Sequence, residues 1–261
     1  MKRHIILISI LCACIFTNSL MACYVPPDEP GCPDCLPPTL EEVIGDSPLV
    51  VDAEPLKGVT ESGYSWVKLV STDQTQIVAT ILLEEAAYAN QNKLGIYNYN
   101  GLGVAPSESE KLLIFNGIDE VGDTADVQFD LLTESAWYDR NGNSIKEPGE
   151  TAHIGNIFGF YLISPDTGCG ICKPTFYTDE LLNPDTTTTE HGLIYDTSHI
   201  TGAIIGDPDV VVAFEDLLMC HADCDYDDMV VGVTGVSAVP EPATLLILGV
   251  GGLVLLRKHR S

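Results

Sequence analysis

Short apolar runs recur through the middle of the chain, and turn-forming Gly, Pro, Asn and Asp stand between them. Runs of this length, rich in β-branched and aromatic residues, are typical of buried β-strands. The predicted strands are Trp66–Val70, Leu94–Tyr99, Lys111–Phe115, Asp126–Leu132, Ile157–Ile163, Thr175–Tyr177, Val210–Phe214 and Met229–Val233. Many short strands joined by turns predict an all-β fold, an antiparallel, jelly-roll-like β-sandwich with one or two short helices.

One segment has a different period. Gln76–Asn90, QIVATILLEEAAYAN, places apolar residues at helical spacing, and Ala, Leu and Glu dominate it. This spacing predicts a short helix. Glu84 and Glu85 are then either metal ligands or part of a solvated helix face.

The chain before this domain has two parts. Residues 1–22, MKRHIILISILCACIFTNSLMA, have a basic start, an apolar run and a small residue at the end, which predicts a secretory signal peptide. Residues 23–58 are rich in proline and lack a sustained period, which predicts an extended linker before a domain at residues 59–236. Leu20–Cys23 resembles a lipoprotein box, so Cys23 is a candidate for lipidation.

The chain is strongly acidic. It has 38 acidic and 12 basic residues, for a net charge of −26. Five of the basic residues but only one acidic residue lie in the two terminal segments, so the central part carries seven basic and 37 acidic residues. Nucleic acid is excluded as a partner, because such binding depends on Lys and Arg that neutralise phosphates. The charge favours divalent cations or cationic surfaces instead.

Six carboxylates lie between the last two predicted strands, and no Lys or Arg occurs from Val210 to Leu256. They are Glu215, Asp216, Asp223, Asp225, Asp227 and Asp228. Two like charges ~4 Å apart repel by ~1 kcal/mol in bulk water, and by more where water is excluded. The cluster is therefore either a solvated acidic turn or a cation site, and calcium, which takes about six to eight oxygen ligands, is the predicted cofactor. The alternation of three of the Asp residues, at 223, 225 and 227, predicts an extended chain that presents them on one face.

The same stretch, FEDL followed by DCDYDDMVV, resembles the C-terminal signature of a bacterial exported domain, the domain-of-unknown-function family 4114. The matching residues are Phe214, Glu215, Asp216, Leu217, Asp223, Asp225, Tyr226, Asp228 and Val230. The chain departs from that pattern at Asp227, where Asn is usual, and at Cys220 and Cys224, where glycines are common. Two further segments, EEAAYANQNKLGIY and FGFYLI, extend the resemblance over most of residues 64–236.

A second oxygen-rich segment lies within Trp137–Glu150. Counted from Asp139, side-chain oxygens fall at positions 1, 3, 5, 9 and 12, and Ile145 at position 7 offers its carbonyl. These residues are Asp139, Asn141, Asn143, Glu147 and Glu150. The spacing is that of an EF-hand-type calcium loop. Ser144 replaces the usual glycine and Pro148 opposes a regular exit helix, so a turn rich in Asn and Gly is an equal alternative.

Seven of the nine cysteines remain after removal of the predicted signal peptide; six of them form three close pairs, and Cys23 is left over. The pairs are Cys32 with Cys35, Cys169 with Cys172, and Cys220 with Cys224. Close pairs suggest zinc in a reducing compartment, but an exported chain favours disulfides. The connectivity stays open, because six cysteines allow 15 pairings.

Residues 237–261 contain the motif Val239, Pro240, Glu241 and Pro242, then an apolar run and the basic residues Arg257, Lys258 and Arg260. The segment resembles the PEP-CTERM sorting signal of Gram-negative bacteria. That resemblance implies export through the Sec machinery, cleavage by a membrane exosortase, and a place at the cell surface or in the extracellular matrix. The run Leu245–Leu256 is shorter than the ~20 residues that span a bilayer, which fits transient membrane contact better than a permanent anchor.

No G-x-S-x-G, H-E-x-x-H, P-loop or dinucleotide-binding glycine pattern is present. The sequence therefore favours a non-catalytic, calcium-stabilised surface or matrix module that contacts exopolysaccharide or other surface components. The alternative is a carboxylate-based, glycan-directed hydrolase, because two carboxylates are the catalytic groups of most glycoside hydrolases.

Overall fold

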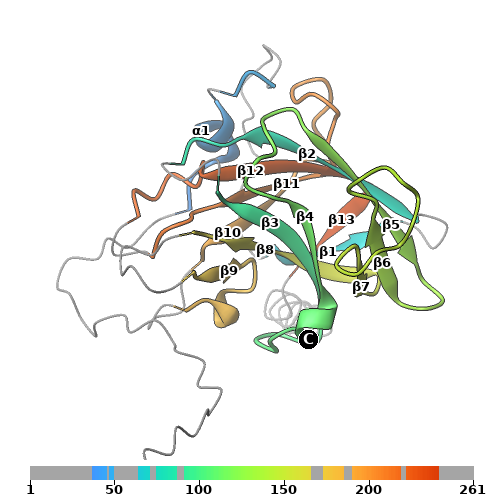
Figure 1. Cartoon of the computed structure of the whole chain (residues 1–261). Helices are drawn as coiled ribbons and strands as arrows, with labels where there is room; N and C mark the ends of the chain where they lie inside the picture. The colour runs from blue at the N-terminus through green and yellow to red at the C-terminus, as the bar shows by residue number, and fades with distance from the viewer. Residues whose placement is uncertain are drawn as a thin grey trace, which may run out of the picture.

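The computed structural model describes residues 37–45, 47–49, 64–70, 75–86, 91–165, 173–184, 190–218 and 222–240. Within these ranges the chain forms 13 β-strands in two sheets, and every strand pair is antiparallel (Figure 1). The two sheets face each other across a common core, so the predicted β-sandwich is confirmed.

The six-stranded sheet has the order β13 (Val236–Pro240), β1 (Tyr64–Leu69), β8 (Ile157–Ile163), β3 (Lys93–Asn98) and β4 (Lys111–Phe115). Its sixth strand, β9 (Thr175–Tyr177), pairs with β8 beside this path. The seven-stranded sheet has the order β10 (Gly192–Asp196), β11 (Val210–Phe214), β12 (Met229–Thr234), β2 (Gln76–Leu83), β5 (Thr124–Asp130), β6 (Ser135–Tyr138), β7 (Thr151–His153). Short 3-10 turns lie at Glu108–Glu110 and Glu180–Leu182.

Alternation along the strands builds the core. In β5, Ala125, Val127 and Phe129 are buried while the residues between them are more exposed, as the two-residue period of a strand requires. Phe129 stacks on Phe158 of β8 in the other sheet, with 5.2 Å between ring centroids. The apolar interior therefore joins the two sheets directly.

The helix predicted over Gln76–Asn90 is wrong, because Gln76–Leu83 is the strand β2. This strand lies in the middle of its sheet, between β12 and β5. Ile77, Ala79 and Ile81 point into the core, so the segment's apolar residues also fit a period of two. Pairing on both sides outweighs helix propensity, which is a weak local preference. Residues 87–90 lie outside the described ranges.

A helix forms instead at Leu40–Ile44, labelled α1, within the segment that the sequence predicts as a linker. Thr39 and Glu42 form a reciprocal capping box at its start. Leu40, Val43 and Ile44 are buried in a second apolar cluster, which they form with residues of the seven-stranded sheet. The capping box explains the start of so short a helix, and burial of its apolar face explains its stability.

The last strand, β13, holds the first half of the predicted sorting motif. Val239 pairs with Trp66 of β1, and Pro240 pairs with Tyr64. Glu241, Pro242 and the apolar run after them lie outside the described residues. Within the described part of the chain, no helix has the length and apolar character needed to span a bilayer.

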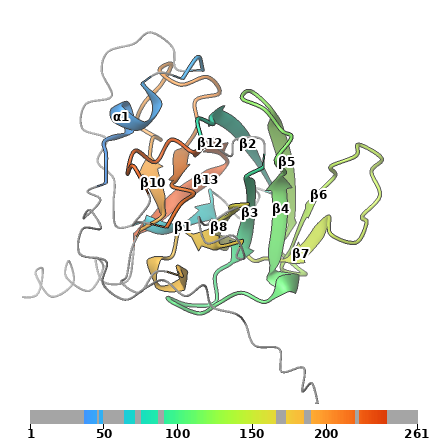
Figure 2. The same cartoon turned by 60° about the vertical axis from the view of Figure 1, so that its left-hand side comes forward.

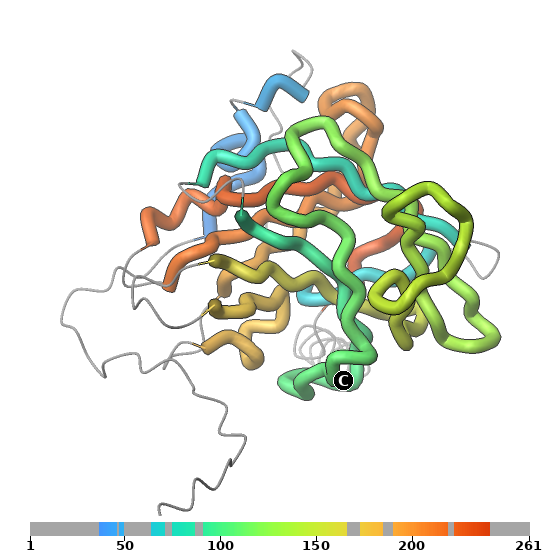
Figure 3. The backbone as a smooth tube through the Cα atoms, viewed as in Figure 1, coloured from blue at the N-terminus to red at the C-terminus, as the bar shows by residue number. Residues whose placement is uncertain are grey.

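Two loops contain the oxygen-rich segments, and Figure 3 shows them on opposite sides of the molecule. The connection between β11 and β12, in orange to red, projects on the left. The connection between β6 and β7, in yellow-green, lies on the right. Each contains one of the two oxygen-rich segments found in the sequence.

Candidate metal centre

The β11–β12 hairpin brings its first and last carboxylates together. Phe214 and Met229 are the final paired residues of the two strands. Glu215 and Asp228 follow at the open end of that ladder, so they lie next to each other. The backbone N–H of Asp216 donates to Asp228 Oδ2 over 2.7 Å, which fixes the turn of the chain after β11. Strand pairing therefore explains why Glu215 and Asp228, which are far apart in sequence, meet.

Three of these carboxylates are buried. The exposed fraction is 0% for Glu215, 1% for Asp216 and 8% for Asp228. One oxygen from each lies within 4.8 Å of the other two. Among the described residues, no Lys or Arg forms an ion pair with any of them within 4.0 Å. Burying unpaired charge is costly, so this cluster requires protons or a cation.

Two further oxygen donors adjoin the cluster. Asn92, just before β3, is fully buried, and its Nδ2 donates to Asp216 Oδ2 over 2.7 Å. The Oδ1 of the same amide accepts no hydrogen bond from the described residues, and neither does the buried Oε1 of Glu84 just after β2. A buried acceptor without a partner costs about 1–3 kcal/mol. We call Glu84, Asn92, Glu215, Asp216 and Asp228 the acidic centre.

The acidic centre holds its protons tightly. Burial raises the pKa of Asp228 to about 9, with the charges of Asp216 and Glu215 adding to the effect. Burial raises the pKa of Glu215 to about 7, and it raises the pKa of Asp216 as well. The pKa of Glu84 rises to about 7 through burial and the charges of Asp119 and Asp216. Near neutral pH Asp228 therefore retains its proton, and Glu215 and Glu84 are partly protonated, unless a cation takes the place of these protons.

The other three carboxylates of the segment lie further out. Asp223 and Asp225 are exposed, and an oxygen from each lies within 4.8 Å of an oxygen of Glu215. Glu215 therefore belongs both to the buried group with Asp216 and Asp228 and to this exposed group. Asp227 is partly buried, and its pKa rises to about 7 through burial and the charge of Asp225. We call Asp223, Asp225 and Asp227 the outer carboxylates.

The prediction that the outer carboxylates alternate along an extended chain is wrong. The intervening residues, Cys224 and Tyr226, have positive φ angles of 69° and 60°. These left-handed conformations curl the loop, so the backbone N–H of Cys224 donates to Glu215 Oε2 over 3.2 Å. Tyr226 is buried and anchors the curl by donating its hydroxyl to the carbonyl of Glu190 over 2.9 Å.

The second predicted calcium segment is arranged differently. Its side chains lie at the surface, in the β6–β7 connection that extends from the sandwich on the right of Figure 2. Asp139 accepts hydrogen bonds from the backbone N–H groups of Asn143 and Ser144, at 3.1 and 2.7 Å. Ser144 has φ of 58°, so it adopts the conformation of the glycine that it replaces.

Most other oxygens of this loop also accept hydrogen bonds from the loop itself. Glu147 accepts from the side-chain amides of Asn141 and Asn143, and Glu150 accepts from the backbone N–H of Glu147. Asn141 and Asn143 also accept from backbone N–H groups. The loop is therefore held together without a cation by its own donors.

One candidate cysteine lies among the described residues. Cys224 is disulfide-bonded, so its sulfur is not a thiolate ligand for zinc. Cys32, Cys35, Cys169, Cys172 and Cys220 lie outside the described ranges. The pairing of the cysteines stays a prediction.

Comparison with known proteins identifies the C-terminal segment. Residues 238–261 match the family model of the PEP-CTERM protein-sorting motif. The match indicates an exported bacterial protein that is sorted to the cell surface, and exosortase is the enzyme that processes such signals. No curated protein and no solved structure shows a significant similarity to the chain. The resemblance of residues 64–236 to family 4114 stays a prediction.

Sequence reasoning identified six of the eight residues that make up the acidic centre and the outer carboxylates, but it did not show which of them are buried. It noted Glu84 but placed it on a helix. It missed Asn92, although the residue lies inside a segment that resembles family 4114. The missing signal is a tertiary contact, because Asn92 and Asp216 are 124 residues apart in sequence.

Proposed function

We propose that the protein is a non-catalytic surface or matrix module whose fold is stabilised by calcium bound at the acidic centre. One observation carries the proposal. Three buried carboxylates converge within 4.8 Å beside a fully buried amide oxygen that has no hydrogen-bond partner among the described residues. A cation at this point would neutralise the carboxylates and occupy the free lone pairs of Asn92 Oδ1.

The donor set favours calcium over other metals. The acidic centre offers only oxygen atoms, which hard cations prefer. The nearby imidazole of His191 stacks on Phe176, with 4.0 Å between ring centroids, and its Nδ1 lies 3.4 Å from the backbone carbonyl of Glu215 rather than from a carboxylate. Calcium accepts about six to eight oxygens in an irregular shell, whereas magnesium requires a smaller octahedron.

A bound cation would connect the two sheets. Glu215, Asp216 and Asp228 belong to the hairpin of the seven-stranded sheet, whereas Asn92 precedes β3 of the six-stranded sheet. Shared ligation would hold these strand ends together in the folded state only. A ligand that binds only the folded state adds ~2.7 kcal/mol of stability at a hundredfold excess over its Kd.

Burial disfavours the alternative, a glycan hydrolase. Hydrolysis requires two carboxyl groups on either side of a sugar bond, ~5 Å or more apart. Glu215 and Asp216 are almost fully covered by protein, so a saccharide cannot reach both. The same carboxylates are well placed for an ion, which needs no open cleft.

Thermal unfolding of the metal-free protein tests the proposal. Millimolar calcium should raise the melting temperature by several degrees, chelation should reverse the change, and magnesium should substitute poorly. Identical melting curves with calcium and with chelator would rule the proposal out.

A further inference from the structure

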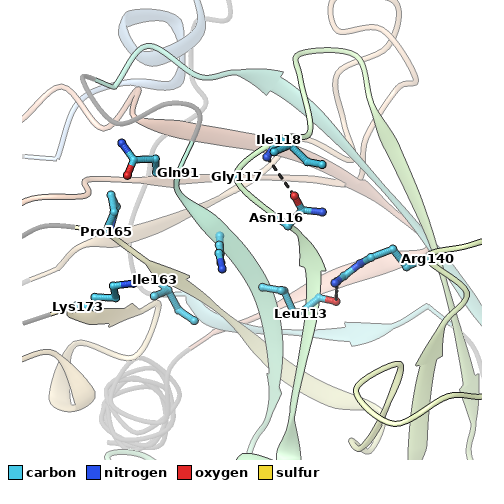
Figure 4. A pocket seen from close by; sticks show the side chains of 10 residues that line it. Gln91, Leu113, Asn116, Gly117, Ile118, Arg140, Ile163, Pro165 and Lys173 are labelled. Carbon is cyan, nitrogen blue, oxygen red and sulfur yellow. Dashed lines mark hydrogen bonds between the residues drawn. The ribbon is translucent and has the colours of Figure 1, made fainter.

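Three of the seven basic residues in the central part of the chain line one pocket, which Figure 4 shows. They are Lys93 at the start of β3, Arg140 after β6, and Lys173 before β9. The pocket has a volume of about 600 Å³. So dense a gathering of cations is unexpected in a central part of the chain that has 37 acidic residues.

Strand register places the pocket on the outer face of the six-stranded sheet. Lys93 pairs with Ile163 of β8, and the nearby residue Leu113 of β4 pairs with Gly95. Leu94 and Ile96, which alternate with these β3 residues, point into the sandwich core. Ile163, Lys93 and Leu113 therefore form a continuous floor across three neighbouring strands.

Arg140 is held at one wall of this floor. Its Nη2 donates to the backbone carbonyl of Leu113 over 2.6 Å, the dashed contact on the right of Figure 4. Its guanidinium carbon lies 5.7 Å from the ring centroid of Tyr138. These contacts fix the guanidinium while leaving most of its five N–H donors available.

The three cations have no carboxylate partner within the described part of the chain. None of them forms an ion pair within 4.0 Å there. Lys93 and Lys173 are exposed. Asp119, in the adjacent turn, accepts a hydrogen bond from the backbone N–H of Asn116 over 2.6 Å. The pocket is therefore a local positive site on a negative surface.

The lining defines the class of ligand. A pocket of this size fits a small molecule or one end of a larger one. The side-chain amides of Gln91 and Asn116 can pair with hydroxyl groups, and Ile118, Ile163 and Pro165 offer apolar contacts for a sugar ring. None of the lining residues is aromatic, so the stacking platform typical of nucleotide-base binding is missing from this pocket.

We propose that this pocket binds one acidic sugar unit, a uronate, whose carboxylate pairs with Arg140 and Lys93. Arginine presents a planar fork that matches a carboxylate in bidentate geometry. The overall negative charge of the domain repels long polyanions, so recognition is confined to the unit seated in the pocket. The inference rests on the pocket alone and does not require calcium in the acidic centre.

Calorimetric titration of the purified protein at physiological salt tests this assignment. The probe is a uronic-acid trisaccharide, and its carboxyl-reduced counterpart, equal in length and linkage, is the neutral control. Arg140→Gln and Lys93→Gln should each weaken uronate binding at least tenfold, with unchanged thermal unfolding. Lys68→Gln, at an exposed position of β1 outside the pocket, should leave the affinity unchanged.

Three results would overturn the assignment. They are equal affinity for the acidic and the neutral trisaccharide, an equal loss in Lys68→Gln and Arg140→Gln, and no binding of the uronate probe at millimolar concentration. The first would show that the carboxylate is not recognised. The second would show a general charge effect rather than a site.

Discussion

The β11–β12 connection and the β6–β7 connection each carry a group of oxygen-bearing side chains that the sequence predicts as a calcium site. They differ in their surroundings. In the β6–β7 connection, Asp139 is partly exposed, the residues after it are exposed, and its carboxylate accepts hydrogen bonds from its own loop. In the acidic centre, Glu215, Asp216 and Asp228 are buried against one another, and Asn92 has an oxygen without a described partner. The sequence alone does not show how these two groups of oxygen atoms differ, whereas their burial and hydrogen bonding in the structure do.

The largest expected effect is a calcium-dependent loss of stability on substitution of Asp228. In metal-free protein near pH 7 the raised pKa of Asp228 keeps this carboxyl protonated, so Asp228→Asn exchanges one neutral group for another and stability should change little. In saturating calcium the variant lacks a ligand, so most of the stabilisation, about 3 kcal/mol at a hundredfold excess, should be lost. Urea unfolding with chelator and with calcium measures both values.

Asp139→Asn in the β6–β7 connection is the matched control. It removes one carboxylate charge from an exposed loop, and its effect should be the same with chelator and with calcium. If the two substitutions respond alike to calcium, the contrast between the two regions is wrong.

The second effect is a pH dependence of the metal-free protein. Burial and neighbouring charge raise the pKa of Glu215 to about 7 and that of Asp228 to about 9 in the folded state. Between their unfolded values and these folded values, the folded protein binds more protons than the unfolded chain. Stability should therefore be greatest at acidic pH and fall by several kcal/mol from pH 5.5 to 8.5, since each group that is protonated only in the folded state contributes ~1.4 kcal/mol per pH unit.

Urea unfolding at several pH values with chelator measures this slope. Saturating calcium should remove most of it at pH 7 and above, because the cation replaces the protons. Glu110 does not oppose the trend, since hydrogen bonds from Ser107 lower its pKa to about 2, outside this window. A metal-free stability that is flat or rises across this range would contradict the account.

The sequence predicted much of the framework and less of the centre. The valine-rich runs of β11 and β12 identify buried strands, and their register places Glu215 beside Asp228. The pattern of β2 fits a helix and a strand equally, and pairing with β12 and β5 decides between them. No local signal shows which of the six carboxylates are buried. Their burial depends on tertiary contacts of the β11–β12 hairpin, such as that of Asp216 with Asn92 before β3 of the other sheet.

A third effect concerns Asn92, which the sequence pattern did not reveal. Asn92→Leu removes the oxygen that has no described partner, so calcium affinity should fall about tenfold, or ~1.4 kcal/mol. Asn143→Leu removes a similar amide oxygen from the β6–β7 connection and should leave the affinity unchanged. Titration with a fluorescent calcium competitor measures both. An equal affinity for Asn92→Leu and wild type would exclude Asn92 as a ligand.

The smallest effect links the two proposed sites. Gln91 and Lys93 line the basic pocket, whereas Asn92 between them contacts Asp216. Calcium ligation by Asn92 would hold the segment that carries both pocket residues in place, so uronate affinity should rise about threefold, and uronate should raise calcium affinity by the same factor. The coupling should vanish in Asp216→Asn and persist in Asp139→Asn, although Arg140 of the pocket is next to Asp139. Coupling that depends on Asp139 instead would move the cation to the β6–β7 connection.

The most direct test of calcium at the acidic centre is calorimetric titration of metal-free protein with calcium near pH 7.5. Wild type and Asp139→Asn should bind calcium with equal affinity, and Asp216→Asn should lose binding at the acidic centre. Absence of calcium binding to the wild type would contradict the account. Binding that survives in Asp216→Asn but is lost in Asp139→Asn would contradict it equally.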